Sequence, residues 1–178
     1  MVWNALSQHR IATYPTPPHG HYPNFVGAGR AAERLEALPV FRNAKTILAG
    51  PDMVLKPLRE TAMRSGKTVV LPHPDKAGKY LSLAGLQPSQ LKRVRDVAQL
   101  GQPVELVSTP VDLVLVGCVA ADERLGWLGK GYGFPYGRLE VGAPWATLAH
   151  TVMLFDVLPC EAERKISLIA TPHQVLGV

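Results

Sequence analysis

A glycine-rich segment, residues 126–134 (GWLGKGYGF), carries the residue types best suited to chemistry in this chain. It follows the most strand-like run of the sequence, residues 111–116, and its glycines stand at every second position around Lys130 and Tyr132, namely Gly129, Gly131 and Gly133. Because glycine has no Cβ, consecutive backbone N–H groups can turn toward one point, and the lysine adds a mobile positive charge. The segment predicts a phosphate or carboxylate site, with a structural turn and a solvated lysine as the alternative.

The segment differs from the common nucleotide-binding motifs. A P-loop has Ser or Thr after its Gly-Lys pair, but here Gly131 follows Lys130, so no hydroxyl is in place for a magnesium ion. The dinucleotide-binding fingerprint has a third glycine three residues further on, and that position is Phe134. The local pattern alone leaves anion binding and a structural turn both open.

Composition and charge set the outer bounds. The chain has 178 residues and a formal net charge of +5, which fits one domain over residues 1–178 and favours an anionic ligand. It shows no apolar run of about 20 residues and no signal-like start, so we expect a soluble cytoplasmic protein with no membrane partner. Lys92-Arg93-Val94-Arg95 is the densest basic cluster, but no aromatic residues interleave with it, so nucleic-acid binding is only weakly supported. Cys118 ends an apolar run and is expected to be a buried thiol.

Alternating strand-like and helix-like segments predict the fold class. We expect helices over 2–10, 28–38, 55–65 and 88–99, and strands over 45–49, 67–71, 111–117, 151–155 and 166–170. Residues 13–25 should form a Pro- and His-rich loop, residues 73–87 an irregular segment, and residues 136–149 a mixed helical stretch. This order predicts a single three-layer α/β/α domain with a mostly parallel, Rossmann-like sheet.

The loops at the carboxyl ends of the predicted strands should share one cleft, because ligands of open parallel sheets bind there. These loops are Gly50–Asp52, Pro72–Lys76, the glycine-rich segment and Thr171–His173. Asp52 could hold a metal or cap the next helix, and the pattern favours the cap. His19 and His21 stand two apart without a visible third ligand, which favours an ordinary loop over a metal site.

The order of several short motifs resembles the 5-formyltetrahydrofolate cyclo-ligase family over nearly the whole chain. The motifs are PNFVGA at 23–28, GKTVVLP at 66–72, DLVLV at 112–116, VLPCE at 157–161 and IATP at 169–172. The loop GKGYGF at 129–134 is similar to the GKGEGF of a divergent branch of that family.

The resemblance implies ATP-dependent conversion of 5-formyltetrahydrofolate to 5,10-methenyltetrahydrofolate, with Mg²⁺, in a monomer or small homo-oligomer. It places Lys130 and Arg138 in catalysis. It implies that the nucleotide is held by Gly129, Lys130, Gly131, Tyr132, Gly133, Phe134 and Arg10, and that the reduced folate is contacted by Pro23, Phe25, Trp127 and Tyr136. A packed surface loop is the alternative for Pro23 and Phe25, and packing in the core or at the rim is the favoured alternative for Trp127. The resemblance identifies no metal ligands.

The chain also departs from the family pattern. Tyr136 stands where the family loop has an Asp that the resemblance makes a metal ligand, and Gly137 stands where it has an Arg, although Arg138 is one step away. Arg10 is the one basic residue of the first predicted helix. These replacements predict weak or absent turnover. The alternative is a protein of the same fold that binds a nucleotide, a folate or a nucleic acid without catalysis.

Overall fold

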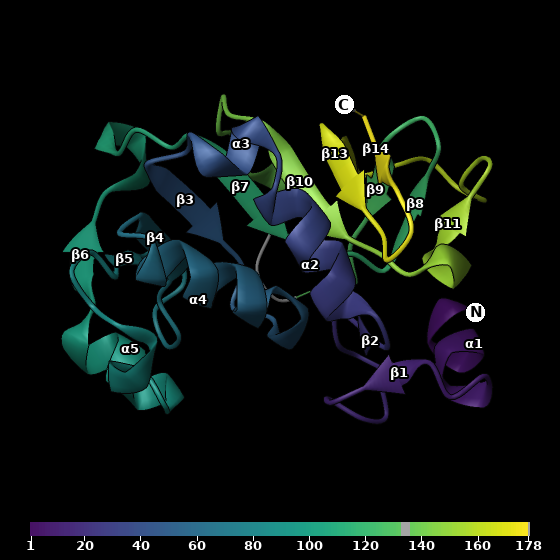
Figure 1. The fold of residues 1–178 in the computed structure, drawn as a ribbon, viewed down its shortest axis with the longest axis horizontal. Helices are drawn as coiled ribbons and strands as arrows, with labels where there is room; N and C mark the ends of the chain where they lie inside the picture. Colours follow the sequence, from purple (N-terminus) through teal and green to yellow (C-terminus); the bar gives the residue numbers. More distant parts are fainter. Residues whose placement is uncertain (133–135, 178) are drawn as a thin grey trace.

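A large, mostly parallel sheet forms the centre of the molecule (Figure 1). The computed structural model describes residues 1–132 and 136–177. The sheet has eight strands in the order β14-β13-β10-β7-β3-β4-β5-β6. Its five parallel neighbours are β13 (Leu168–Ala170), β10 (Trp145–Leu148), β7 (Leu113–Val116), β3 (Thr46–Ala49) and β4 (Thr68–Pro72). The antiparallel edges are β5 (Tyr80–Ser82), β6 (Gln102–Val104) and β14 (Val175–Leu176).

The central strands are apolar because both of their faces are covered. Every residue of β7 and β10 is buried. The helices α2 (Ala28–Glu36), α3 (Pro39–Arg42) and α4 (Lys56–Arg64) lie across one face of the sheet (Figure 1). Helix α2 buries Ala28, Ala31, Ala32 and Leu35, a stripe at helical spacing. The core therefore runs between these helices and the sheet.

Helices α1 and α5 lie at opposite ends of the molecule. Helix α5 (Val94–Leu100) and the short η2 (Pro88–Gln90) lie beside the β5–β6 end of the sheet, whereas α1 (Val2–Gln8) lies at the other end (Figure 1). Helix α1 packs against η5 (Thr151–Met153), and strands β1 (Ala12–Thr13) and β2 (Asn24–Phe25) pair beyond it. No helix in the described ranges is long and apolar enough to cross a bilayer.

A second, four-stranded sheet carries the glycine-rich segment. Its order is β11-β8-β9-β12, formed by Leu154–Phe155, Ala120–Asp122, Gly126–Leu128 and Arg164–Lys165. The buried Asp122 Oδ1 accepts hydrogen bonds from the backbone N–H groups of Arg124 (3.0 Å) and Gly126 (2.8 Å), which holds the turn between β8 and β9. Since β9 ends at Leu128, this sheet fixes the start of the glycine loop at residue 129.

The predicted α/β class with a mostly parallel sheet is confirmed, but three segments were wrong. Residues 151–155, expected to form one strand, begin with the short helix η5 and only then form β11. Residues 136–149 contain the buried central strand β10 rather than a helical stretch. A run of four buried residues could not be told from a helix turn by periodicity, and pairing with β7 and β13 decides the strand. The segment expected to be irregular, 73–87, contains β5. Cys118 is buried as predicted, and burial raises the pKa of its thiol, so it is a core residue.

Candidate functional site

The site begins at the turn that follows β3. Gly50-Pro51-Asp52 leads from the strand into the short helix η1 (Met53–Leu55). Asp52 stands at the N-cap position of that helix, but its side chain makes no capping hydrogen bond, which corrects the expectation of a side-chain cap. Its Oδ2 atom is buried, and burial raises the pKa of the carboxyl group against the opposing charges of Lys130 and Arg59. The carboxyl group is therefore held inside the protein next to two cations.

Arg59 on α4 holds this turn by hydrogen bonds to its backbone. Its Nη1 donates to the carbonyl oxygens of Gly50 (2.9 Å) and Asp52 (2.7 Å). Burial lowers the pKa of the guanidinium, and the charge of Asp52 opposes that shift. Arg59 thus fixes the backbone of the turn and places a positive charge beside the Asp52 carboxyl group.

Tyr136 reaches the same turn from η4 (Tyr136–Arg138), after the glycine loop. Its buried hydroxyl interacts with the carboxyl group of Asp52 and lies against Gly50. An ideal Cβ at Gly50 would lie 2.7 Å from Asp52 Oδ2 and would collide with the Tyr136 hydroxyl. The glycine is needed here because the tyrosine and the carboxylate approach the backbone so closely.

The glycine loop is partly satisfied by protein groups. The N–H of Gly129 donates to Glu163 Oε1 at 3.1 Å, and the backbone of Lys130 lies near the Tyr22 hydroxyl. Gly131 has φ +81°, and a Cβ built there meets none of the described residues within 4 Å. One of the N–H groups expected to cradle an anion is therefore already paired, while no described residue fills the space beside Gly131. Gly133 and Phe134 lie outside the described residues.

An aromatic cluster supports the lysine of this loop. The Tyr22 ring lies 6.4 Å from Trp127 and 5.9 Å from Tyr136, centroid to centroid. The ammonium of Lys130 lies 5.2 Å from the ring centroids of both Tyr22 and Tyr132. Within the part of the chain that the structure describes, no ion pair with Lys130 is found within 4.0 Å. The ammonium of Lys130 is stabilised by the two aromatic faces and by the negative charge of the nearby Asp52.

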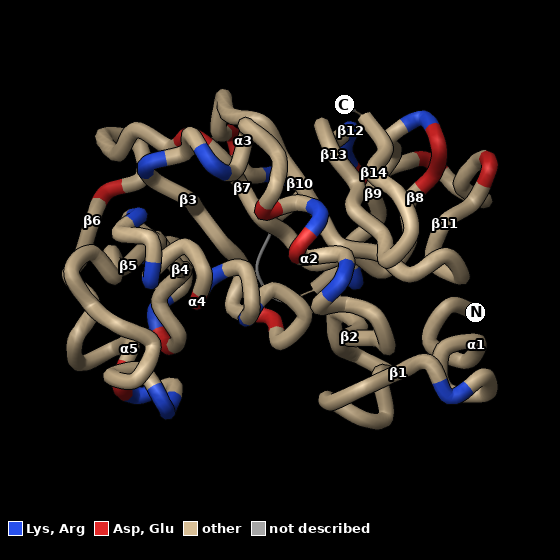
Figure 2. Tube along the Cα trace, in the orientation of Figure 1, with Lys and Arg blue, Asp and Glu red and all other residues tan. Residues whose placement is uncertain are grey.

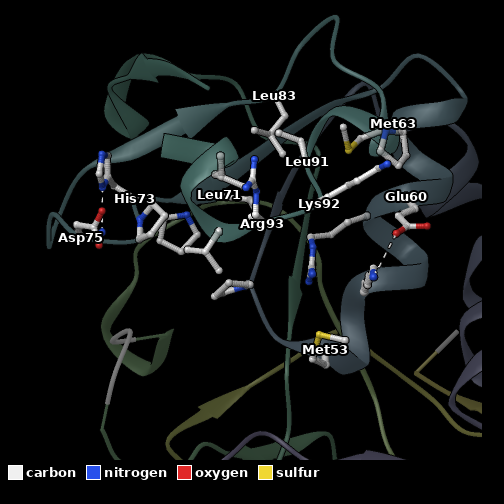
Figure 3. Close-up of a pocket in the computed structure, with 18 of the residues that line it drawn as sticks. Met53, Glu60, Met63, Leu71, His73, Asp75, Leu83, Leu91, Lys92 and Arg93 are labelled. Carbon is white, nitrogen blue, oxygen red and sulfur yellow. Dashed lines mark hydrogen bonds and ion pairs between the residues drawn. The ribbon is translucent and has the colours of Figure 1, made fainter. Parts of the chain in front are cut away.

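A cavity of about 680 Å³ opens beside the Asp52 turn (Figure 3). Its floor is apolar, and Figure 3 shows side chains of α4, β4 and the α5 region around one space. The apolar lining includes Met53, Met63, Leu71, Leu83, Leu91 and Val97. The turns at 50–52 and 72–76 both contribute, through Pro51 and through Pro72 to Lys76, so two of the four loops expected to form a cleft do line one cavity.

The rim of the cavity is basic. Figure 2 shows lysine and arginine positions along the chain around α4, β5 and α5. The lining contains the cations Lys56, Arg59, Lys76, Lys92 and Arg93 against the acids Glu60 and Asp75. Glu60 is already paired with Lys56 (3.8 Å) and with Arg64 (2.9 Å). An apolar floor with a cationic rim suits a ligand with a flat ring system and a carboxylate tail.

Some residues that the resemblance assigned to the site do not line this cavity. Trp127 is fully buried and its indole N–H donates to the Gly117 carbonyl (2.8 Å), and Phe25 is 2% exposed, so both are core residues rather than rings open to a ligand. Pro23 is also buried. Arg10 is exposed just past α1, at the end of the molecule away from α5 (Figure 1). Arg138 is exposed on η4.

The described residues do not fit a resident metal site. They contain no group of three or more His, Cys, Asp or Glu side chains placed to hold an ion. The Asp52 carboxyl group already has Lys130 and Arg59 as neighbouring cations. His19 Nε2 is bonded to Asn4 Oδ1 at 2.7 Å.

Sequence reasoning missed three residues that build the site. Arg59 stands seven positions after Asp52, two helical turns on, and this spacing was the available signal. Tyr22 and Glu163 contact the glycine loop across more than thirty residues of separation, and no local pattern marks them.

Comparison with known proteins agrees with this architecture. The model of the 5-formyltetrahydrofolate cyclo-ligase family matches residues 4–172. The chain is 31% identical to the methenyltetrahydrofolate synthase domain-containing protein of Bos taurus and 28% identical to that of Homo sapiens. The alignments cover 98% and 99% of this chain but 51% of each relative, so the chain spans about half the length of these proteins.

Solved structures show the same fold at low identity. The NMR structure of 5,10-methenyltetrahydrofolate synthetase from Aquifex aeolicus superimposes with a TM-score of 0.66 at 20% identity, covering 99% of this chain and 90% of that one. The synthetase from Mycoplasma pneumoniae gives 0.57 at 16% identity and covers 95% of each chain. With a family match over nearly its whole length, this chain belongs to the 5-formyltetrahydrofolate cyclo-ligase family.

Proposed function

We propose that this protein converts 5-formyltetrahydrofolate to 5,10-methenyltetrahydrofolate in an ATP-dependent reaction in the cytoplasm. The observation that carries the proposal is the position of Asp52. Its buried carboxyl group lies at the carboxyl end of β3, at the edge of the cavity that Pro51, Met53 and Arg59 line, and close to the cation of the glycine loop. The Asp52 turn thus lies between a cavity that can accommodate a folate and Lys130, the lysine proposed to bind phosphate.

The cavity fits a reduced folate by its chemistry. A pterin is a flat ring system with a hydrogen-bonding edge, and the apolar floor formed by Met53, Leu71 and Leu83 suits its faces. Asp52 does not itself line this cavity, so its carboxyl group acts on the site through the charges of its neighbours Lys130 and Arg59. Lys76, Lys92 and Arg93 at the rim suit the carboxylates of the glutamate tail. The ligand would then lie with its ring toward the Asp52 turn.

The glycine loop supplies the nucleotide side of the site. In the reaction, the formyl oxygen attacks the γ-phosphorus of ATP and ADP leaves. A second folate nitrogen then attacks the activated carbon and closes the ring, and loss of phosphate from that carbon gives the methenyl product. This chemistry needs charge neutralisation and alignment rather than a covalent nucleophile on the protein. Lys130 provides the cation, and the open backbone beside Gly131 leaves space for a phosphate group.

Magnesium enters this proposal only with the nucleotide. A magnesium ion in such sites is bound mainly by substrate phosphates and one or two carboxylates. Because the described residues form no metal cluster of their own, we derive no catalytic step through a metal held by the protein.

The test is the absorbance rise of 5,10-methenyltetrahydrofolate in a mixture of the purified protein, ATP, Mg²⁺ and 5-formyltetrahydrofolate. We expect product only when ATP is present, and less product with Asp52→Asn. Folding of the variant is checked by its melting temperature. Product formation without ATP, or an Asp52→Asn variant as fast as the parent, would contradict the proposal.

Binding without turnover is the second candidate, and one observation favours it. The N–H group of Gly129 is bonded to Glu163, which reduces the number of donors left for a phosphate. A thermal-shift series with ATP, ADP and 5-formyltetrahydrofolate separates the two functions, because a ligand that binds the native state raises the melting temperature even where no product forms.

A further inference from the structure

The glycine loop holds its lysine in an unusual way. Lys130 Nζ lies 5.2 Å from the ring centroid of Tyr22 and 5.2 Å from that of Tyr132, so the ammonium contacts two aromatic faces. Tyr22 is a core residue at 4% exposure, and its ring is fixed by Trp127 and Tyr136. Tyr132 is 56% exposed and comes from the loop itself. The Tyr22 ring is therefore part of the core, whereas the Tyr132 ring belongs to an exposed side chain.

The Tyr132 ring spans the gap between two loops. An ideal Cβ at Gly20 would lie 3.0 Å from the Tyr132 hydroxyl, so this tyrosine rests on the Pro- and His-rich loop at a position that has no side chain. Gly20 has φ +80°, a conformation that favours glycine. The Tyr132 ring therefore lies against the Lys130 ammonium, and its hydroxyl lies against Gly20.

We propose that Tyr132 is a positioning residue, which with Tyr22 clamps the Lys130 ammonium while leaving its N–H donors open to an anion. Aromatic rings attract a cation without neutralising its charge or using its hydrogen atoms as a carboxylate does. In the described ranges no carboxylate lies within ion-pair distance of Lys130, so an incoming phosphate would not have to displace one. The inference rests on the proposed function for the identity of the anion, but not for the clamp itself.

The clamp is tested first without substrate or nucleotide. Trace labelling with acetic anhydride, followed by mass spectrometry, measures the reactivity of each lysine, with the exposed Lys165 as internal reference. An exposed cation–π contact contributes about 0.5–1 kcal/mol, so Tyr132→Ala should raise the relative labelling of Lys130 by about 2- to 5-fold. Tyr132→Phe keeps the ring and should label as the parent does. Equal labelling in all three proteins would overturn the clamp.

The consequence for ligand binding is tested with ATP and with inorganic tripolyphosphate. Tyr132→Ala should weaken both by about 2- to 5-fold, and Tyr132→Phe should restore parental affinity. Tyr132→Glu places a carboxylate beside Lys130, which should neutralise it and weaken both ligands by about tenfold or more. If Tyr132→Phe is as weak as Tyr132→Ala, the hydroxyl contact at Gly20 matters rather than the ring, and the inference is wrong. If the parent binds neither ligand, the proposed function fails while the labelling result still decides the clamp.

Discussion

The hydroxyl of Tyr136 and the carboxyl group of Asp52 meet over the backbone of Gly50. The three residues come from two strand-end segments that lie more than eighty positions apart in the sequence. Because Arg59 also bonds to the carbonyl oxygens of Gly50 and Asp52, this contact joins β3, α4 and the segment after the glycine loop. The catalytic proposal depends on this junction, and it gives the first prediction.

Gly50→Ala should disrupt the site and lower stability. The added Cβ has no room between Asp52 Oδ2 and the Tyr136 hydroxyl, and overpacking of this kind costs about 1–3 kcal/mol. Gly29→Ala is the matched control, because Gly29 lies within α2 and a Cβ there meets nothing within 4 Å. The control should gain about 0.5–1 kcal/mol. Urea unfolding measures both, and equal stability of the two variants would refute the close approach.

Asp52→Asn should change how stability depends on pH. Burial raises the pKa of Asp52 in the folded protein above its unfolded value of about 3.9, so the folded state binds this proton more tightly. The parent is therefore most favoured below the unfolded pKa, and it loses stability as pH rises through the raised pKa. Asparagine does not titrate, so the variant should lack this loss. Parallel curves of unfolding free energy from pH 4 to 8 would show that the carboxyl group is not perturbed.

Gly131→Val should abolish ATP binding in a folded protein. Gly131 has φ +81°, and a Cβ there meets none of the described residues within 4 Å, so the substitution strains the backbone without a clash among them. Gly85→Val is the control, since Gly85 has φ +77° and is equally open but lies outside the loop. Both variants should lose similar stability, and only Gly131→Val should lose the thermal shift with ATP. A parental shift in folded Gly131→Val would contradict a phosphate site at this loop.

The sequence predicted the elements whose signals are local. Helix α2 and strands β3, β4, β7 and β13 follow from apolar periodicity and flanking breakers. Strand β10 could not be predicted in this way, because its four residues form a strand only through pairing with β7 and β13. The second sheet was missed for a similar reason, since β11 and β12 have two residues each and depend on partners distant in sequence.

The residues of the candidate site likewise fall into those that a local pattern could predict and those that depend on tertiary packing. Lys130 and the glycines could be singled out because unusual residues stand at regular spacing. The ring stacking of Tyr22, the Glu163 contact with Gly129 and the burial of Trp127 depend on which face of the small sheet packs inward. A tryptophan next to a glycine loop is compatible with a ligand contact or a core residue, and tertiary packing decides for the core.

Arg138→Ala should reduce turnover without reducing stability. The expected catalytic role of Arg138 stays a prediction, and its exposure on η4 leaves the guanidinium accessible to a ligand. A charge aligned with a transferring phosphoryl group contributes at least about tenfold to the rate. Arg124→Ala is the control, because Arg124 is an exposed arginine at the β8–β9 turn. Equal kcat values for the two variants would remove Arg138 from the catalytic residues.

Turnover of the parent protein should be slower than about 1 per second, the low end of ordinary enzymes. Tyr136 and Gly137 stand where the family resemblance places an aspartate and an arginine in the loop. The Tyr136 hydroxyl is directed to Asp52 rather than open to the nucleotide. Phosphoryl transfer depends on positioning and charge neutralisation, so the loss of two charged groups should cost several orders of magnitude in kcat while folate binding persists. The methenyltetrahydrofolate absorbance assay at saturating ATP and 5-formyltetrahydrofolate measures kcat, and a melting-temperature rise with the folate alone measures binding. A rate of about 1 per second or faster would mean that Arg138, Lys130 or Arg59 supplies the missing charge, and the single Ala variants of these residues would then show which one does.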